Sequence, residues 1–379
     1  MTVIIKSDKK ATASLGNVNG IKGPQDWSMF FDFENEIYST KTGGVLKQNY
    51  ALSDVVEATR QNLNGAPISI NKSGVERAIT SNAEIRTALL KNGRFGVLAE
   101  DVNENFFLNS SAPASQSISL AAAATRIVVS CEGSGSITVS GDVVGAGAVV
   151  TKDTPRVFDR ISASAVCNLN LVVSGSLTHA QVELATGSQT GTSKIKTGSA
   201  SVIRPRELVK VKQSLLNSII QNKSAITVLV QTIDYNPVVN PTMNSTVRFG
   251  LESGQSLKLM RGAGILANLN LNDYVLQYID ATSTSSAQIQ AGVFSASNRF
   301  SVFNQATALN DGSVLSAFNG VQGNPLSIVN PFPVADIVFG FGYSSPIARN
   351  GLRGIVTKLI VYDRVLTQAE ITELTRSWN

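Results

Sequence analysis

Apolar and polar positions alternate in short runs along much of the chain, which is the pattern of β-strands that bury one face. Between residues 106 and 184 the alternating runs are Ser115–Leu120, Ser136–Ser140 and Asn168–Val172, with glycine and serine between them. Short strands separated by turn residues, with few charges, predict a small β-sandwich or jelly roll over residues 106–184.

The same pattern of short strand-like runs separated by turn residues returns after residue 205. The run Ile226–Ile233 is rich in β-branched residues and lies between Ser224 and Asp234. Further strand candidates are Thr246–Gly250, Tyr274–Ile279, Arg299–Asn304, Ile337–Phe341 and Ile355–Tyr362. Because turn residues separate these runs, they predict a second two-sheet sandwich over residues 205–379.

The period of the pattern changes after the last of these strands. Thr367 precedes Glu370 by three residues, which is the spacing of a helix capping box. Leu366 and Ile371 occupy the two positions of a hydrophobic staple. The apolar residues that follow share one helical face; they are Ile371, Leu374 and Trp378. We therefore expect a short helix that packs on the sandwich and closes it.

Residues 1–105 are more mixed and contain the other helix candidates. Ser53 is placed to cap a helix that begins at Asp54 and ends at Gly65-Ala66-Pro67. An imperfect apolar stripe from Val75 to Leu90, followed by Gly93, predicts a second helix. We expect a small α/β region here that serves docking or oligomerisation.

Residues 185–204 are rich in glycine, serine and threonine, which predicts a linker or an extended crossover strand. The densest basic stretch, Lys194–Lys212, overlaps this segment and contains one acid, Glu207. It has no aromatic residue on which a base could stack, so we interpret it as a solvated linker and expect no nucleic-acid partner.

Composition agrees with a chain of packed strands. Hydrophobic residues make up 43% of the 379 residues and charged residues only 16%, while the net charge is +5. The two cysteines, Cys131 and Cys167, lie in apolar strand-like runs and are expected to be small buried thiols. The alternative is that they face each other across a sandwich and oxidise after cell lysis.

The start, MTVIIKSDKK, lacks the apolar length and the cleavage site of a signal peptide. No stretch approaches the roughly 18 apolar residues of a membrane span. We therefore expect synthesis in a cytoplasm without membrane insertion.

Candidate chemistry is sparse. The single histidine, His179, has only Glu183 as an acidic neighbour, which favours a histidine on a strand of the middle block over a catalytic or metal site. Asp32, Glu34 and Glu36 alternate, so on a strand they would share a face. We expect this face to be exposed to solvent. The alternatives are that it binds a cation, contacts another subunit or supplies the catalytic carboxylates of a glycosidase.

Calcium is the cofactor alternative that the sequence leaves open, although no specific motif supports it, and we expect no cofactor. The loops with suitable oxygens are Asp234-Tyr235-Asn236, Asn268–Asp273 and Asn310-Asp311-Gly312, each of which is also ordinary turn chemistry. The glycine pairs in Gly262–Gly264 and Gly340–Tyr343 lack the lysine of a phosphate loop. A sugar site needs aromatic platforms beside planar polar groups. The candidate aromatics are Tyr235, Tyr274, Tyr278, Phe303, Phe332 and Tyr343, and the pattern does not select among them.

The C-terminal segment GLRGIVTKLIVYDRVLTQAEITEL resembles the closing strand and helix of concanavalin A-like and laminin G-like domains. The residues that carry this resemblance are Gly354, Ile355, Leu359, Val361, Tyr362, Arg364, Leu366, Thr367 and Glu370. Upstream, Val314–Val321 resembles the strand and Asn-Gly turn of the same domains. The resemblance covers residues 205–379 and implies a β-sandwich closed by a short helix.

Four phrases, in order, resemble those of bacteriophage tail and head fibre or decoration proteins. They are Gly96–Glu100, Asn105–Ser110, Gly133–Gly141 and Ala180–Glu183. This chain has Asn103-Glu104-Asn105 where those proteins usually have Arg-Thr-Asn. The resemblance implies a carbohydrate-binding-module-like jelly roll in the middle of the chain, a virion setting and a homo-oligomer, with a trimer favoured.

Together the patterns predict a mainly β protein without enzymatic activity: a virion structural subunit, whose partners are other virion proteins and host surface polysaccharide. Two alternatives stay open. One is a receptor-binding lectin at a tail tip, and the other is a polysaccharide depolymerase. The sequence selects no catalytic, metal or glycan-binding residue.

Overall fold

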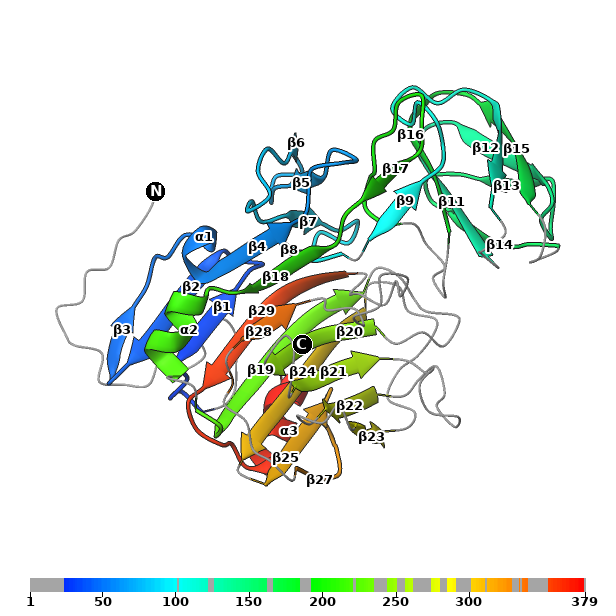
Figure 1. Ribbon diagram of the computed structural model, residues 1–379. Helices are drawn as coiled ribbons and strands as arrows, with labels where there is room; N and C mark the ends of the chain where they lie inside the picture. The colour runs from blue at the N-terminus through cyan, green and yellow to red at the C-terminus, as the bar shows by residue number, and fades with distance from the viewer. Residues whose placement is uncertain are drawn as a thin grey trace.

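The computed structural model describes residues 24–100, 102–121, 126–161, 166–184, 192–220, 223–234, 244–250, 256–261, 274–279, 285–290, 301–310, 312–328, 334, 336–339 and 354–377. These residues form two β-sandwiches of unequal size, which lie side by side (Figure 1). The mainly β fold class with a short C-terminal helix is therefore confirmed.

The first layer of the large sandwich is a sheet of eleven strands. Its main path runs β26 (Val321–Gln322), β25 (Ser313–Phe318), β24 (Ser301–Asn310), β19 (Ile226–Asp234), β29 (Gly354–Tyr362), β1 (Met29–Asp32), β2 (Ile37–Thr42) and β3 (Val45–Lys47). Off this path β27 (Leu326–Ser327) pairs with β25, while β8 (Phe95–Leu98) pairs with β29 and β7 (Thr87–Leu89).

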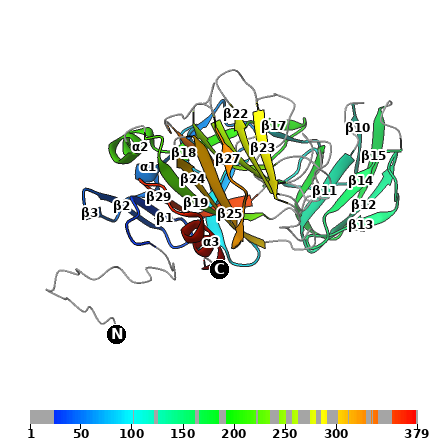
Figure 2. The same cartoon turned by 90° about the horizontal axis from the view of Figure 1, so that it is seen from below.

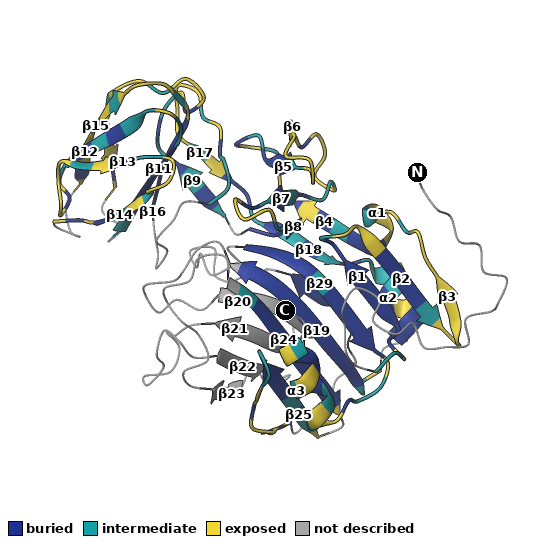
Figure 3. Cartoon of the chain, turned by 180° about the vertical axis from the view of Figure 1, so that it is seen from behind, coloured by how far each residue is buried: buried dark blue, intermediate teal, exposed yellow. Residues whose placement is uncertain are grey.

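The second layer is a sheet of seven strands. Their order is β23 (Ser285–Gln290), β22 (Tyr274–Ile279), β21 (Ser256–Arg261), β20 (Asn244–Gly250), β28 (Ile337–Phe339), β18 (Glu207–Val211) and β4 (Val56–Arg60). The main core includes alternate residues from strands of both sheets, such as Val228 and Val230 of β19 and Val209 and Val211 of β18. Figure 3 shows β19, β29 and β1 almost wholly buried.

Strands from both ends of the chain share these sheets. Met29–Asp32 pairs with β29 across Lys358–Val361, and β4 pairs with β18. The boundary that the sequence placed near residue 105 therefore does not separate the N-terminal strands from residues 205–379. The reason is that Met29, Phe31 and Phe33 are apolar side chains of the main core and need the other strands to cover them.

Both N-terminal helix predictions were wrong. The helix expected from Asp54 is only the four-residue α1 (Leu52–Val55), after which the chain continues as β4. Within β4, Val56, Ala58 and Arg60 are buried at alternate positions, so the period is that of a strand. The expected helix at 75–90 is instead β6 (Glu76–Ala78), which pairs with β5 (Ile68–Ile70), followed by β7.

The small sandwich consists of a four-stranded and a three-stranded sheet. The first has the order β10 (Gln116–Leu120), β15 (Cys167–Ser174), β12 (Ser136–Gly141) and β13 (Ala148–Val150). The second has the order β14 (Arg156–Asp159), β11 (Arg126–Gly133) and β16 (Leu177–Leu184). Cys131 and Cys167 are buried free thiols of the core between them, as the sequence predicted.

A two-stranded ladder connects the sandwiches. Strand β9 (Asn103–Asn105) leads into the small sandwich and β17 (Val202–Arg204) leads out of it, and the two pair antiparallel. The small sandwich is thus inserted between two segments that both belong to the large one (Figures 1 and 2). The sequence left two alternatives for residues 185–204, a linker or an extended crossover strand, and Val202–Arg204 forms a strand.

The closing helix α3 (Gln368–Ser377) follows its prediction. Glu370 accepts hydrogen bonds from the backbone N–H (2.7 Å) and the hydroxyl (2.9 Å) of Thr367. Ile371 and Leu374 are fully buried against the outer face of the large sheet, while Trp378 lies outside the described residues. The other helix, α2 (Gln213–Ile220), buries Leu216, Ile219 and Ile220. None of the helices in the described ranges has the length and apolar character of a membrane span.

Candidate functional site

Five buried charged side chains meet where the two sandwiches join. Arg86 contacts Glu100 at 3.3 Å and Glu207 at 3.0 Å. Arg60 contacts Glu207 at 2.6 Å, and Arg204 contacts Glu100 at 2.9 Å. All five side chains are 0–1% exposed. We call this cluster the ionic joint, and it ties β4, β17 and β18 to the chain around β8.

Further hydrogen bonds support the joint. Ser193 donates its backbone N–H to Glu100 at 2.9 Å, and its hydroxyl contacts Arg86, Arg204 and Glu100. Arg86 also donates to the carbonyl of Ile68 at 2.9 Å. Buried charges are tolerated where such partners replace water, so the segment at Ser193 completes the joint rather than covering it passively.

A second set of polar side chains lies beside it on the outer face of β16, and we call it the polar seam: the buried Asn103, Asn105, Gln181 and Glu183, with the half-buried Thr192. Asn105 donates to the carbonyl of Ile195 at 2.8 Å and accepts from the N–H of Val182 at 3.0 Å. Glu183 accepts from the N–H of Thr192 at 2.7 Å and from Asn103. Burial raises the pKa of Glu183 despite these bonds.

The solvated-linker prediction for the basic stretch was therefore wrong. Arg204 and Ile195 are both 0% exposed, and Gln181 accepts the backbone N–H of Ile195 at 2.9 Å. The hydroxyls of Thr192 and Ser193 instead contact the buried carboxylates of Glu183 and Glu100.

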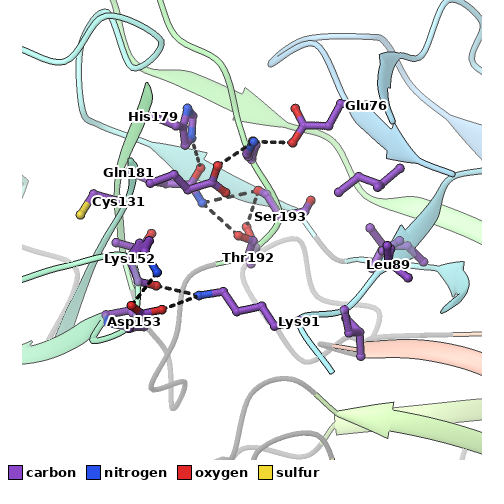
Figure 4. A pocket seen from close by; sticks show the side chains of 18 residues that line it. Glu76, Leu89, Lys91, Cys131, Lys152, Asp153, His179, Gln181, Thr192 and Ser193 are labelled. Atoms are coloured by element: carbon purple, nitrogen blue, oxygen red, sulfur yellow. Dashed lines mark hydrogen bonds and ion pairs between the residues drawn. The ribbon is translucent and has the colours of Figure 1, made fainter. Parts of the chain in front are cut away.

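A cleft of about 370 Å³ lies next to the joint, between the small sandwich and the chain around β5–β8. One wall is polar and comes mainly from β11, β16 and residues 192–194: Ser130, Glu132, His179, Gln181, Thr192, Ser193 and Lys194. The facing wall is mainly apolar: Ile70, Ala88, Leu89, Leu90 and Leu98. Figure 4 shows Leu89 across the cleft from His179 and Gln181.

Ion pairs span the cleft at two places. Lys194 contacts Glu76 of β6 at 2.5 Å and Glu132 of β11 at 2.7 Å. Burial disfavours the charged form of Lys194, but the two carboxylates outweigh it and raise the pKa. At the other place Lys91 donates to the carbonyl of Lys152 at 2.7 Å and lies 3.6 Å from Asp153 (Figure 4). These contacts connect the two sandwiches around the cleft.

His179 lies on β16, as the sequence favoured, and forms part of the polar wall. Its side chain is buried, and its Nε2 atom lies 3.2 Å from Oε1 of Gln181. Burial lowers the pKa of His179, so the ring is neutral near pH 7.

The carboxylate triplet does not form a common face. Asp32 ends β1 and is fully buried, with both oxygens accepting from Asn35 at 2.9 Å. Glu34 pairs with Arg94, and Glu36 is exposed with a positive φ of 59°. The strand assumed for this run was wrong, because Phe33–Glu36 is the turn between β1 and β2.

The remaining candidates are widely scattered. The described residues contain no group of three or more His, Cys, Asp or Glu side chains that could hold a metal ion. The calcium-loop candidates at Tyr235-Asn236, 268–273 and Asp311 lie outside the described residues, as do both glycine pairs. Of the aromatic candidates, Phe303 is a buried core residue. Tyr274 and Tyr278 belong to β22, whereas Tyr235, Phe332 and Tyr343 lie outside the described residues.

Of the residues that line the cleft, Cys131, His179 and Lys194 were named from the sequence, and most of the others were missed. Ser130 and Glu132 alternate with buried residues on β11, so a strand pattern places them on its outer face. No local signal indicates that β7 lies opposite, because that depends on how the inserted sandwich folds back. The joint residues also lie far apart in sequence, and no local pattern indicates that they form a buried cluster.

No family model and no curated protein matches the sequence. Among solved structures, the chain is similar to the CBM40 of the Ruminococcus gnavus IT-sialidase bound to α2,6 sialyllactose, with 13% identity, a TM-score of 0.32, and coverage of 40% of this chain and 82% of that one. It is also similar to domain 4 of the arabinanase AbnA of Geobacillus stearothermophilus in complex with arabinotriose, with 16% identity, a TM-score of 0.33, and coverage of 50% and 82%. These values are low, and we take neither a ligand nor an activity from them.

Proposed function

We propose that the chain is a non-enzymatic structural subunit of a bacteriophage virion, a fibre or decoration protein, whose β-sandwiches contact host surface glycans. The observation that carries the proposal is the place of the fibre-like phrases. Gly96–Glu100, Asn105–Ser110 and Ala180–Glu183 supply Glu100 of the ionic joint and Asn105, Gln181 and Glu183 of the polar seam.

Those phrases are therefore the residues that hold one sandwich against the other. A subunit that presents a module on the outside of a particle needs a defined orientation between its parts. Buried ion pairs and hydrogen bonds supply it, because any reorientation would leave charges desolvated and unpaired. A fixed orientation between the two sandwiches serves a structural role and requires no chemical step.

The depolymerase alternative loses its main support. Catalysis by a carboxylate pair needs two groups that approach one glycosidic bond from opposite sides, about 5–9.5 Å apart. Asp32 is buried with its oxygens occupied by Asn35, and Glu34 is bound to Arg94. The lectin alternative keeps support from the cleft, whose polar and apolar walls suit a small organic ligand.

Immunogold electron microscopy of intact particles tests the virion assignment. Antibodies raised against the whole chain should label particles at one structural location, head, collar or tail, and at constant stoichiometry. Labelling only in the lysate supernatant would contradict the proposal. Light scattering of the purified chain tests the favoured trimer, and a monomer at all concentrations would exclude it.

A polysaccharide-clearance assay separates the third alternative. The whole chain should clear no capsule or slime from host lawns. Clearance that is lost in both Glu34→Gln and Glu36→Gln, with unchanged thermal unfolding, would overturn the non-enzymatic proposal.

A further inference from the structure

We propose that the cleft between β7 and the outer face of the small sandwich binds a neutral oligosaccharide. This inference rests on the proposed contact with surface glycans and deepens it, because it names a site and a class of sugar.

The two walls differ in the way that a sugar ring requires. A pyranose or furanose presents C–H groups on its faces and hydroxyls around its rim. Leu89 and Ile70 offer an apolar surface for a face, while the opposite wall carries a hydroxyl on Ser130 and a carboxylate on Glu132. A volume of about 370 Å³ falls within the usual range of small-molecule sites, roughly 300–1,000 Å³.

The charges indicate a neutral ligand. The cleft is lined by three cations, Lys91, Lys152 and Lys194, and by three anions, Glu76, Glu132 and Asp153. Each cation already contacts one or more of these anions: Lys194 contacts both Glu76 and Glu132, and Lys91 and Lys152 contact Asp153. An acidic sugar would add a negative charge beside these carboxylates, whereas hydroxyl groups can add to the ion pairs as donors or acceptors.

The lining also predicts weak binding by a single subunit. No Phe, Tyr or Trp side chain is among the residues that line the cleft in the described part of the chain, so the cleft lacks the large aromatic platform of a strong sugar site. Several copies on one particle would compensate, because linked weak sites gain avidity without new contacts. A dense array of immobilised glycans is therefore the appropriate assay.

The test uses the full chain on an array of immobilised neutral oligosaccharides, three to six units of arabinose, xylose, glucose, mannose or galactose, together with 3′- and 6′-sialyllactose. Ser130→Trp places an indole in the cleft from the outer face of β11. Ser119→Trp is the matched control, since Ser119 is exposed on β10 of the other sheet. Thermal unfolding reports whether each variant is folded.

We expect binding to one or more neutral glycans, a loss of at least tenfold in Ser130→Trp, and little change in Ser119→Trp. If Ser130→Trp does not fold, Leu89→Ser removes part of the apolar wall and should weaken binding several-fold. Equal binding by the wild type and both cleft variants overturns the cleft as the site. Preference for the sialylated probes overturns the neutral class.

The two proposals fail separately. If no glycan on the array binds the chain while the immunogold antibody labels the particle, the cleft proposal is overturned and the structural function stands. If neutral glycans bind through the cleft while particles carry no label, the chain is a lectin outside the virion and the structural function falls.

Discussion

Charged residues in apolar surroundings decide how the two sandwiches are held together. Arg86 contacts two carboxylates and a backbone carbonyl, and all of these groups are removed from water. The sequence pattern placed Arg86 in an expected helix and did not indicate its partners, because Glu100 and Glu207 reach it through tertiary structure. Neither the burial of this charge nor the identity of its counter-ions was predicted from the sequence.

Replacing Arg86 with methionine should lower the free energy of unfolding by about 3–5 kcal/mol, since Glu100 and Glu207 would lose a buried partner. Urea unfolding followed by circular dichroism measures the change. Arg126→Met is the matched control, because Arg126 pairs at 2.7 Å with Asp159 at the surface and should cost less than about 1 kcal/mol. Equal effects of the two substitutions would mean that the joint does not stabilise the fold.

The single histidine gives a pH dependence with a definite sign. Burial lowers the pKa of His179 in the folded chain, while the unfolded chain keeps a pKa near 6.5. As the pH falls below about 6.5 the unfolded chain takes up a proton that the folded chain does not, so stability decreases. Glu132, Glu76 and Lys194 also face the ring, but burial is the larger effect.

The free energy of unfolding of the wild type should therefore fall more between pH 7.5 and pH 5.5 than that of His179→Gln. The difference can reach at most about 1.4 kcal/mol per pH unit, the limit for one proton. Both proteins keep Glu183, whose raised pKa has the opposite sign, so its contribution cancels in the comparison. Parallel pH curves for the two proteins would contradict the prediction.

At the scale of single elements, strands with one buried face were predictable and strands in mixed segments were not. Tyr274–Ile279 matches β22 residue for residue, and Thr367 with Glu370 caps α3 as expected. The helix prediction after Ser53 was wrong because Ser53 and Asp54 have the local pattern of a helix start. The alternating burial of Val56, Ala58 and Arg60 depends on pairing with β18. Pairing with a strand more than 140 residues away in sequence outweighed the local preference for a helix.

One glycine explains part of the fibre-like phrase that begins at Gly96. Strand β8 pairs with β29 there, and a Cβ at Gly96 would collide with the carbonyl oxygen of Val356. Gly96→Ala should therefore lower stability by about 1–3 kcal/mol, because the strands must move apart. Gly198→Ala is the control, since nothing lies within 4 Å of its Cβ. Thermal unfolding of both variants checks the prediction, and an unchanged midpoint for Gly96→Ala would contradict it.

At the scale of the whole molecule, the chain is not a row of independent modules. The large sandwich takes β1, β2, β3, β4, β7 and β8 from the first 100 residues and its other strands from residues 207–362. The sequence pattern separated residues 1–105 from residues 205–379 because the first block lacks the regular alternation of apolar and polar positions. Sheet membership is non-local, and only the folded chain reveals it.

A fragment of residues 205–379 should consequently fail to fold as a soluble domain, although texture suggests a complete sandwich. Without β1 and β4, side chains such as Val361 and Val209 lose their neighbours, and two sheet edges become exposed. The full chain is the control in size-exclusion chromatography and thermal circular dichroism. A monomeric fragment with a cooperative transition would contradict the described strand order.

The ladder of β9 and β17 has a consequence for exchange between proteins. Asn105 and Val202 are paired residues, so the chain leaves and re-joins the large sandwich at adjacent points, about 5 Å apart. A module that takes the place of the small sandwich therefore has to bring its ends to that spacing and to supply the partners that Ser193 gives to the buried charges of the ionic joint. Exchange at these two positions would leave the strand order of the large sandwich unchanged while it replaces one wall of the cleft.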